Sequence, residues 1–464
     1  MNTALRHLTT SAALAGGLLA SPLAAQTVAQ TVAQTVAQSV ARSARAADTL
    51  YLDELQRAAE SVDRRAAQVE LLSQQAALRL KTIQSERRPT LAAIGTAQYL
   101  SDVTSVGAVL PNGAGIPAPY HEQFDSYLTI RQPLVDPTRR ERVAVEQASL
   151  AESQARVRTA LWQQRAVVNE AFFGVLLREA QRASLSAAVE ELLARRTVAV
   201  TRVSAGAALQ SEVSLLDAEL MRRRQTMAEL DIERAAAREV LAALTGRSIP
   251  ETSILALRAT DGAADSAEER ATLPSPTTLD SLRARPEYAQ FARTRDAIDA
   301  RRDAVRAQDK VRVSAFARTG YGRPGLNQLG RGFDSYWNAG VQLEWSPFNW
   351  GRTHREQEVQ AVQAELVSAD ESAFTESLRR AAITEYARFS AIARSLADDD
   401  TIIALRQQVV RESALRYDAG ELTMPEFIAR STELLSATLD RDTRRVRLRE
   451  ARVRYLTTIG REVR

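Results

Sequence analysis

The sequence contains no cysteine among its 464 residues. This absence excludes disulfide bonds, thiolate metal sites and a lipidated N-terminal cysteine. Aromatic residues make up only 5% of the chain, which is sparse for large compact cores and suits alanine-rich helices packed side by side. Lysine is nearly absent too, since Lys81 and Lys310 are the only two. Acidic residues almost balance the arginines, so the bulk charge gives little reason to expect a nucleic-acid partner.

Long apolar runs are lacking as well. After the N-terminus no stretch approaches 18 uninterrupted apolar residues, so no transmembrane helix is predicted. At the N-terminus, Arg6 and His7 precede the short apolar run 12–19 and a zone of small residues, which is typical of a signal peptide. We expect a cleaved signal peptide over 1–25, then a flexible leader over 26–47, where one tetrapeptide recurs.

Motifs for catalysis and metal binding are missing. The three histidines, His7, His121 and His354, are far apart and predict no metal site. The glycine-rich stretch 320–325 lacks the Lys-Ser/Thr of a phosphate loop, and no nucleophile elbow is present. We therefore predict that the chain is not an enzyme, with no catalytic residue, metal or cofactor.

What the chain does contain is two copies of one plan. Matching residues recur in the same order at a constant offset, which indicates a tandem duplication. The matched pairs are Pro133 and Pro347, Phe172 and Tyr386, Gly206 and Gly420, and Gly246 and Gly460. The duplication predicts a first repeat over 48–246, a linker over 247–277, a second repeat over 278–460 and a tail over 461–464.

Each repeat is predicted to begin with one helix. In the first repeat, apolar residues recur every three or four positions from Leu55 to Ile83, and Pro89 follows. The corresponding helix of the second repeat is expected from about Leu279 to Asp309.

Two much longer helices are predicted in the hairpins 138–246 and 352–460. The segments 138–204 and 352–418 contain no proline, and their only glycine is Gly174. Each predicts a continuous helix of about 100 Å at 1.5 Å per residue. Helices of this length must pack lengthwise against partners, but any long coiled coil would show the same periodicity.

Two strand pairs, over 90–132 and 311–345, favour a membrane protein. The stretch 336–345 alternates apolar and polar residues, with Trp337 and Trp345 at the ends of the apolar face. These tryptophans are about 27 Å apart in a strand, which matches a membrane-facing band with aromatic girdles. A soluble sandwich remains possible for any single strand.

Four strands are too few to close a barrel, and lipid tolerates no open sheet edge. We therefore expect several chains to share one barrel, and three chains would give twelve strands.

In this order, the motifs resemble those of the TolC-like outer-membrane efflux proteins, also called outer-membrane factors. The resemblance covers about 49–460. It is carried by the strand-to-helix motifs Gln132-Pro133-Leu134-Val135-Asp136 and Ser346-Pro347-Phe348-Asn349-Trp350-Gly351, and by the glycine turns Val203-Ser204-Ala205-Gly206 and Tyr417-Asp418-Ala419-Gly420.

The resemblance implies a mainly α fold with four transmembrane β-strands per chain. In the homotrimer, the barrel would continue into a periplasmic α-helical tunnel, and the connections 103–121 and 322–332 would be extracellular loops. It also implies an outer-membrane exit duct for efflux or type I secretion that works with a periplasmic adaptor and an inner-membrane transporter. The alternatives are an exported coiled-coil scaffold or adaptor without a barrel, and a passive outer-membrane pore.

Functional residues are expected mainly at the two hairpin turns. Gly206 and Gly420 predict positive φ angles, and by the resemblance the adaptor docks there. Glu212 and Glu426 each follow a turn glycine by six residues and would form two rings of negative charge at the tunnel entrance. For both carboxylates a helix-capping role is also open, and the two roles do not exclude each other.

The sequence departs from the family's gate pattern at this place. Leu215 and Ala429 occupy positions where a second Asp can occur, and Leu422 stands where an Arg can form a latch. We therefore expect packing of Leu209, Leu422 and Tyr417 to contribute to the constriction.

Overall fold

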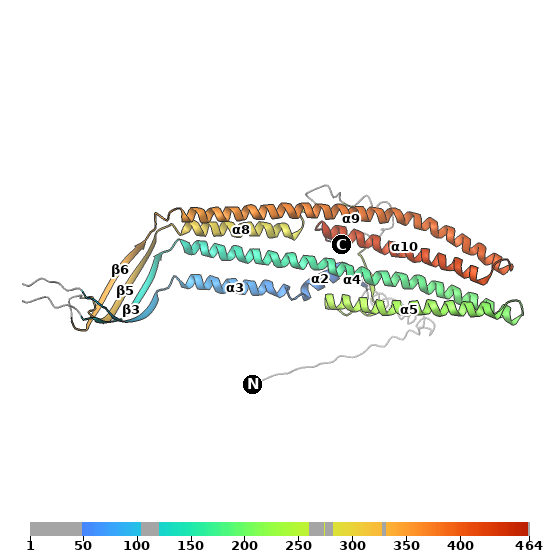
Figure 1. The fold of residues 1–464 in the computed structure, drawn as a ribbon, viewed down its shortest axis with the longest axis horizontal. Helices are drawn as coiled ribbons and strands as arrows, with labels where there is room; N and C mark the ends of the chain where they lie inside the picture. Colours follow the sequence, from blue (N-terminus) through green and yellow to red (C-terminus); the bar gives the residue numbers. More distant parts are fainter. Residues whose placement is uncertain (1–48, 104–119, 259–272, 274–281, 327–330, 463–464) are drawn as a thin grey trace, which may run out of the picture.

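The computed structural model describes residues 49–103, 120–258, 273, 282–326 and 331–462. The predicted signal peptide and leader lie outside these residues, as do most of the loop 103–121 and of the linker 247–277. The described chain is an elongated stack of helices with a small sheet at one end (Figure 1). None of its described helices is both long and apolar enough to cross a membrane.

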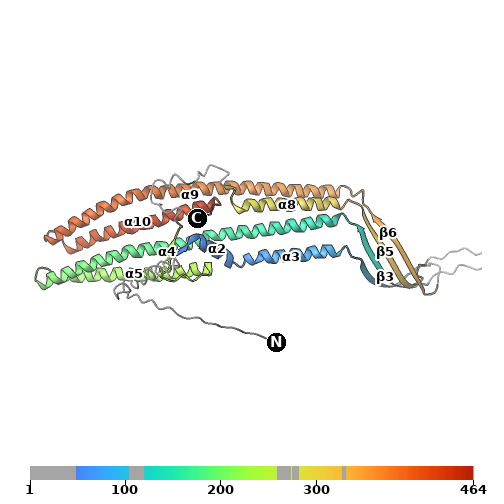
Figure 2. The same ribbon diagram turned by 180° about the vertical axis from the view of Figure 1, so that it is seen from behind.

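Two helices run most of the length of the stack. They are α4 (Thr138–Ser204) and α9 (Arg352–Asp418), and each has 67 residues, as the lack of proline predicted. Helices α5 (Gln210–Thr245) and α10 (Met424–Thr458) return antiparallel to them and complete two hairpins. Both hairpin turns lie at the end of the stack remote from the sheet (Figure 2).

Shorter helices complete the half of the stack next to the sheet. Helix α3 (Ala66–Ser85) packs against α4, and α8 (Pro286–Ala307) packs against both α4 and α9. In the other half α10 packs against α9 and α4, and α5 packs against α4. The helices therefore form one layer in which elements of the two repeats lie side by side.

The single helix expected from Leu55 to Ile83 is wrong, because α2 (Leu52–Val62) and α3 are separate helices. Between them the Asp63 carboxylate accepts hydrogen bonds from the backbone N–H of Arg65 at 2.8 Å and from its guanidinium at 3.0 Å. Such a local Asx-type turn competes with helical backbone bonding. The periodicity did not reveal this break, because the apolar spacing continues through it.

Helix α2 lies against α4 and α5, where the structure has its largest apolar cluster. The short strands β1 (Thr49–Tyr51) and β4 (Ile254–Ala256) pair in parallel beside it. At the same height in the stack, a series of buried polar side chains connects three helices. Gln56 donates to Asn169 at 2.6 Å and Asn169 donates to Thr457 at 3.0 Å, so α2, α4 and α10 are joined there.

The sheet contains four antiparallel strands in the order β2-β3-β5-β6, and the central β3–β5 pairing joins the two repeats. The outer strands β2 and β6 have no second partner within the described residues. The bounds are β2 Thr90–Tyr99, β3 Glu122–Val135, β5 Arg312–Arg323 and β6 Asp334–Glu344. Strand β3 thus runs past the expected end at residue 132, through Pro133, where the register shifts between Pro133 and Val135.

The strand register divides the sheet into two chemically different faces. One face is apolar and exposed, with Leu91, Leu128, Ile130, Ala317, Tyr321, Trp337, Val341 and Leu343 among its residues. The opposite face is largely polar, with Asp125, Thr129, Arg131, Arg312, Arg318, Asn338, Gln342 and Glu344. The alternation of apolar and polar residues, which the sequence shows clearly over 336–345, therefore extends across all four strands.

Two glycines with positive φ, one after α10 and one in the α4–α5 turn, differ in their surroundings, which allows a test of the packing. Gly460 has φ +83°, and a Cβ added to it would lie 2.7 Å from the backbone nitrogen of Arg285. Gly206 has φ +72°, but an added Cβ would meet no atom within 4 Å.

We expect Gly460→Ala to lower the free energy of unfolding by about 2–4 kcal/mol, because left-handed strain and a backbone clash act together. Gly206→Ala should cost only about 1–2 kcal/mol, since strain alone acts there. Denaturation of both variants in detergent, followed by circular dichroism, measures the difference. Equal losses would show that Arg285 does not pack tightly on Gly460.

Candidate functional site at the hairpin tip and the sheet-to-helix junctions

The two hairpin turns have the same backbone geometry. Gly206 and Gly420 both have positive φ, +72° and +79°, as predicted. Around them the N–H of Ala207 donates to the carbonyl of Arg202, and the N–H of Glu421 to that of Arg416, each at 2.8 Å. This hydrogen bond belongs to the Schellman motif, in which a left-handed glycine satisfies the last carbonyls of a helix. An added Cβ at either glycine would meet no atom within 4 Å, so both turns are open.

Tyr417 and Glu212 are brought together at the tip. The Tyr417 hydroxyl donates a hydrogen bond to Oε2 of Glu212, which links the α9–α10 hairpin to the α4–α5 hairpin. The tyrosine side chain is buried, and its ring lies 5.3 Å from the Arg202 guanidinium and 6.2 Å from the Phe427 ring. Burial, followed by the hydrogen bond to Glu212, raises the pKa of Tyr417 to about 12. The hydroxyl therefore stays a donor throughout the physiological pH range.

A second link between the hairpins was missed from the sequence. Arg202 lies 3.5 Å from Asp418, so a charge pair accompanies the Tyr417–Glu212 hydrogen bond. Both residues stand shortly before the turn glycines, and this position is the only feature of the sequence that indicates such a pair.

Glu426 has a different environment from Glu212. Its carboxylate accepts hydrogen bonds from the backbone N–H of Thr423 at 2.9 Å and from the Thr423 hydroxyl at 2.7 Å, which forms a capping box at the start of α10. The backbone hydrogen bond is the main cause that holds the pKa of Glu426 below its usual value. The side chain is exposed and keeps its negative charge.

The two predicted leucines also differ. Leu209 is 71% exposed, whereas Leu422 packs against the apolar cluster that contains Tyr417, Met424 and Phe427. Within one chain, therefore, Tyr417 and Glu212 meet directly, Leu422 supports Tyr417, and Leu209 stands on the surface.

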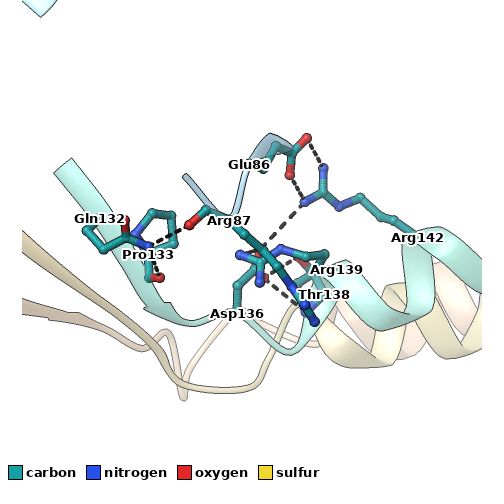
Figure 3. Close-up of polar contacts among 8 residues, drawn as sticks. All are labelled: Glu86, Arg87, Gln132, Pro133, Asp136, Thr138, Arg139 and Arg142. Carbon is teal, nitrogen blue, oxygen red and sulfur yellow. Dashed lines mark hydrogen bonds and ion pairs between the residues drawn. The ribbon is translucent and has the colours of Figure 1, made fainter. Parts of the chain in front are cut away.

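The first sheet-to-helix junction is held by charged groups rather than by Pro133 itself (Figure 3). Asp136 accepts hydrogen bonds from the Thr138 backbone N–H at 3.0 Å and from its hydroxyl at 2.6 Å, where α4 begins. Arg142 lies 3.5 Å from Asp136 and donates to Glu86 at the end of α3. The junction therefore fixes α4 to α3 as well as to the strand.

Charge also sets the protonation state of this junction. Burial alone would raise the pKa of Asp136, but the Thr138 hydrogen bonds and the nearby Arg139 and Arg142 outweigh it, so the pKa is lowered. Asp136 is therefore an anion at neutral pH.

The second junction is built differently. After Pro347, the Asn349 amide donates to Asp309 at 2.8 Å and to the Thr353 hydroxyl at 2.6 Å. Trp350 and Gly351 both have positive φ, +53° and +72°, and the Trp350 side chain is 91% exposed. Phe348 is also exposed, as are the two tryptophans predicted to form a girdle, Trp337 and Trp345.

The polar face of the sheet contains one cluster that the sequence did not indicate. Arg318 pairs with Asp125, donates to the Tyr336 hydroxyl at 2.5 Å and stands 3.4 Å above the centre of the Tyr127 ring. The Tyr336 ring fits beside residue 320 because that residue is a glycine, since an added Cβ would lie 2.7 Å from the ring. No group of three or more His, Cys, Asp or Glu side chains in the described part of the chain is arranged to hold a metal ion.

The fold is that of solved outer-membrane channels. The match to CusC covers 89% of this chain and 93% of that chain, with a TM-score of 0.65 and 15% sequence identity. The match to the outer-membrane channel OprN covers 89% and 90%, with a TM-score of 0.60 and 18% identity. The outer membrane protein VceC of Vibrio cholerae matches over 89% and 97%, with a TM-score of 0.59 and 14% identity.

No protein-family model and no curated protein matches the sequence. At such low identity the structural matches establish the fold, and they confirm the TolC-like architecture that the sequence predicted. Each is described as a channel or an outer membrane protein and none as an enzyme.

The charge at the first junction predicts a pH-dependent contribution to stability. We expect Asp136→Asn to lower the free energy of unfolding at pH 7 by about 0.5–1 kcal/mol, because the amide still accepts from Thr138 but no longer attracts Arg139 and Arg142. The pKa of Asp136 is lowered in the folded chain, so its charge stabilises above the unfolded value of about 3.9. That stabilisation is lost as the pH falls through the lower folded value.

Unfolding of wild type and variant at pH 7 and at pH 3 measures this difference. The difference in free energy of unfolding between the two proteins should be smaller at pH 3 than at pH 7. A difference that does not change with pH would mean that the charge of Asp136 contributes nothing.

Proposed function

We propose that this chain is an outer-membrane exit duct that belongs to a tripartite efflux system or a type I secretion system. In this role it passes small molecules, such as drugs or metal ions, or secreted protein to the exterior. The observation that carries the proposal is the exposed apolar face that continues across all four strands of an open-edged sheet. A soluble scaffold or adaptor has no use for such a face, whereas a lipid bilayer covers it.

The sheet edges support a homotrimer. Strands β2 and β6 leave their outer backbone groups without a strand partner in the described chain. Such groups cost several kcal/mol each in hydrocarbon, so the β2 edge of one copy would pair with the β6 edge of the next. Three copies give twelve strands, which is enough to close a barrel around the polar face.

The helices extend this barrel into the periplasm. A 67-residue helix is about 100 Å long, and both hairpins reach that distance on the same side of the sheet. An ordinary porin has short periplasmic turns instead, which favours a duct with periplasmic partners over a passive pore. The open turns at Gly206 and Gly420 are the surface we assign to docking of a periplasmic adaptor, which connects the duct to an inner-membrane transporter.

The remote end of the hairpins would be the tunnel entrance. In a trimer, Glu212 and Glu426 provide six carboxylates there, Glu212 held by the Tyr417 hydroxyl of the other hairpin and Glu426 by the Thr423 backbone N–H of its own helix start. Fixed carboxylates near a narrow passage favour cations. The Tyr417–Glu212 bond and the packing of Leu422 hold the two hairpins together, which keeps the entrance constricted.

The mass of the detergent-solubilised protein tests the shared barrel. We expect the mature protein, extracted from outer membranes in mild detergent, to have a protein mass of three chains of at most 50.9 kDa each. Light scattering with the detergent contribution subtracted measures this mass. A stable monomer that needs no detergent would rule out the membrane assignment and favour a coiled-coil scaffold.

The carboxylates at the entrance predict ion selectivity. In planar bilayers under a salt gradient, Glu212→Gln/Glu426→Gln should lose most of the cation preference of the wild-type channel, because six negative charges are removed from the trimer. The reversal potential measures the preference. Tyr417→Phe is the matched control, since it removes a hydroxyl but no charge.

Tyr417→Phe should raise the single-channel conductance by loosening the hairpins while it leaves the selectivity unchanged. Unaltered selectivity in the double Gln variant would refute the carboxylate rings, and unaltered conductance in Tyr417→Phe would refute the link between the hairpins.

A further inference from the structure

A groove crosses one face of the helical layer where α10 lies between α4 and α9. It consists of two adjoining cavities, of about 390 and 300 Å³, which share Arg388 and Arg447. The cavity towards α4 is also lined by Glu170, Phe173, Gly174, Leu177, Val446 and Glu450. The cavity towards α9 is also lined by Ala391, Ile392, Ser395 and Arg444. Arginines therefore gather at the α9 end, and the α4 end combines apolar side chains with the carboxylates of Glu170 and Glu450.

The two shared arginines have no ion-pair partner among the described residues. Arg444 and Arg454 beside them do form ion pairs. Arg444, for example, is paired with Asp399. Both free guanidiniums are exposed to the groove. A guanidinium presents a planar fork of donors that matches carboxylate, sulfonate and phosphate oxygens.

The duplication shows that these charges are a local departure from the shared plan. The offset that pairs Gly206 with Gly420 also pairs Gly174 with Arg388 and Glu233 with Arg447. In the first repeat Arg178 donates to the Gly174 carbonyl at 2.9 Å and lies 3.2 Å from Glu233, so the place is neutral. In the second repeat the same two places hold arginines that have no ion-pair partner in the described part of the chain.

The groove and α2 lie on different sides of α4. On α4, Arg165 donates to Glu60 and Asn169 accepts from Gln56, both on α2, whereas Gly174 and Leu177 line the groove. At about 100° per residue these two sets of residues are roughly 130° apart around the α4 axis. Helix α2 and the β1–β4 pair thus thicken a side of the layer that the groove does not share. Because the inside of a closed tube has less room than the outside, this arrangement favours the thinner, grooved side as the inner wall.

We propose that this groove is a binding site for amphiphilic organic anions on the inner wall of the duct, an inference that rests on the proposed function. Arg388 and Arg447 hold the carboxylate, sulfonate or phosphate of the ligand at the α9 end. Leu177, backed by the buried Phe173 and Val446, contacts its apolar body at the other end. The Glu170 and Glu450 carboxylates at that end orient the ligand, because they repel a reversed one. A trimer has three such sites, well separated from the carboxylates of the entrance.

The test uses naphthalene-1-sulfonate, a small anion with an apolar ring system. Isothermal titration into the solubilised trimer in a non-ionic detergent measures binding without requiring conduction. Block of single-channel current by the same compound measures access from the lumen. Arg388→Gln/Arg447→Gln should weaken both binding and block by about tenfold or more, since two charge-assisted contacts are lost.

The control is Arg394→Gln/Arg449→Gln, which removes the same charge from the same two helices. Arg449 is two residues from Arg447 and points about 160° away from it, and both control arginines are exposed. This variant should bind and be blocked like the wild type.

The outcomes separate the two proposals. Equal binding by the wild type and Arg388→Gln/Arg447→Gln, or equal weakening in the control variant, overturns the anion site. Binding that depends on Arg388 and Arg447 in a protein that forms no channels overturns the duct and leaves the site standing. Binding that depends on them without block of the current places the groove outside the lumen and overturns its assignment to the inner wall.

Discussion

A sheet in hydrocarbon can leave no backbone N–H or C=O unpaired, and this constraint governs the rest of the molecule. Within the described residues one chain supplies four strands with an apolar face and two open edges, so the proposed barrel is incomplete until strands of other copies meet β2 and β6. The central β3–β5 pair already joins the two repeats, and the long helices continue from strands on either side of it. In the proposed trimer, the pairing of these strand edges therefore determines how the helices are arranged around the barrel axis.

The duplication provides the two hairpins, and later differences between the repeats give each region its character. The turns have nearly the same geometry, but Tyr417 reaches across to Glu212, and Glu426 caps its own helix. The two sheet-to-helix junctions differ as well. Charges around Asp136 hold the first, and a neutral amide with two left-handed residues forms the second. Similar backbones thus carry different side-chain chemistry in the two halves.

Regular features of this fold could be predicted from the sequence, and local ones could not. The absence of proline defined both 67-residue helices, and the glycines defined the turns, because each feature depends on backbone preferences of single residues. The break at Asp63 depends on a local side-chain hydrogen bond that the apolar spacing does not record, and the course of β3 through Pro133 depends on pairing with β5, which lies far away in the sequence. The same reason hid the Arg202–Asp418 pair and the Arg318 cluster on the polar face. At the hairpin tip, the sequence indicated which residues matter, but it did not indicate which of their side chains contact each other.

The near absence of lysine has a practical consequence for labelling this molecule. Both lysine side chains are exposed in the half of the stack next to the sheet, Lys81 on α3 and Lys310 just before β5. Apart from the N-terminal amine, amine-directed dyes or cross-linkers would therefore attach to side chains near the sheet and leave the hairpin tips unmodified. Because the chain has no thiol, a cysteine introduced at a tip would react alone. Two independent chemistries can thus mark the two ends of the helical stack, and the distance between them can be followed in a working assembly.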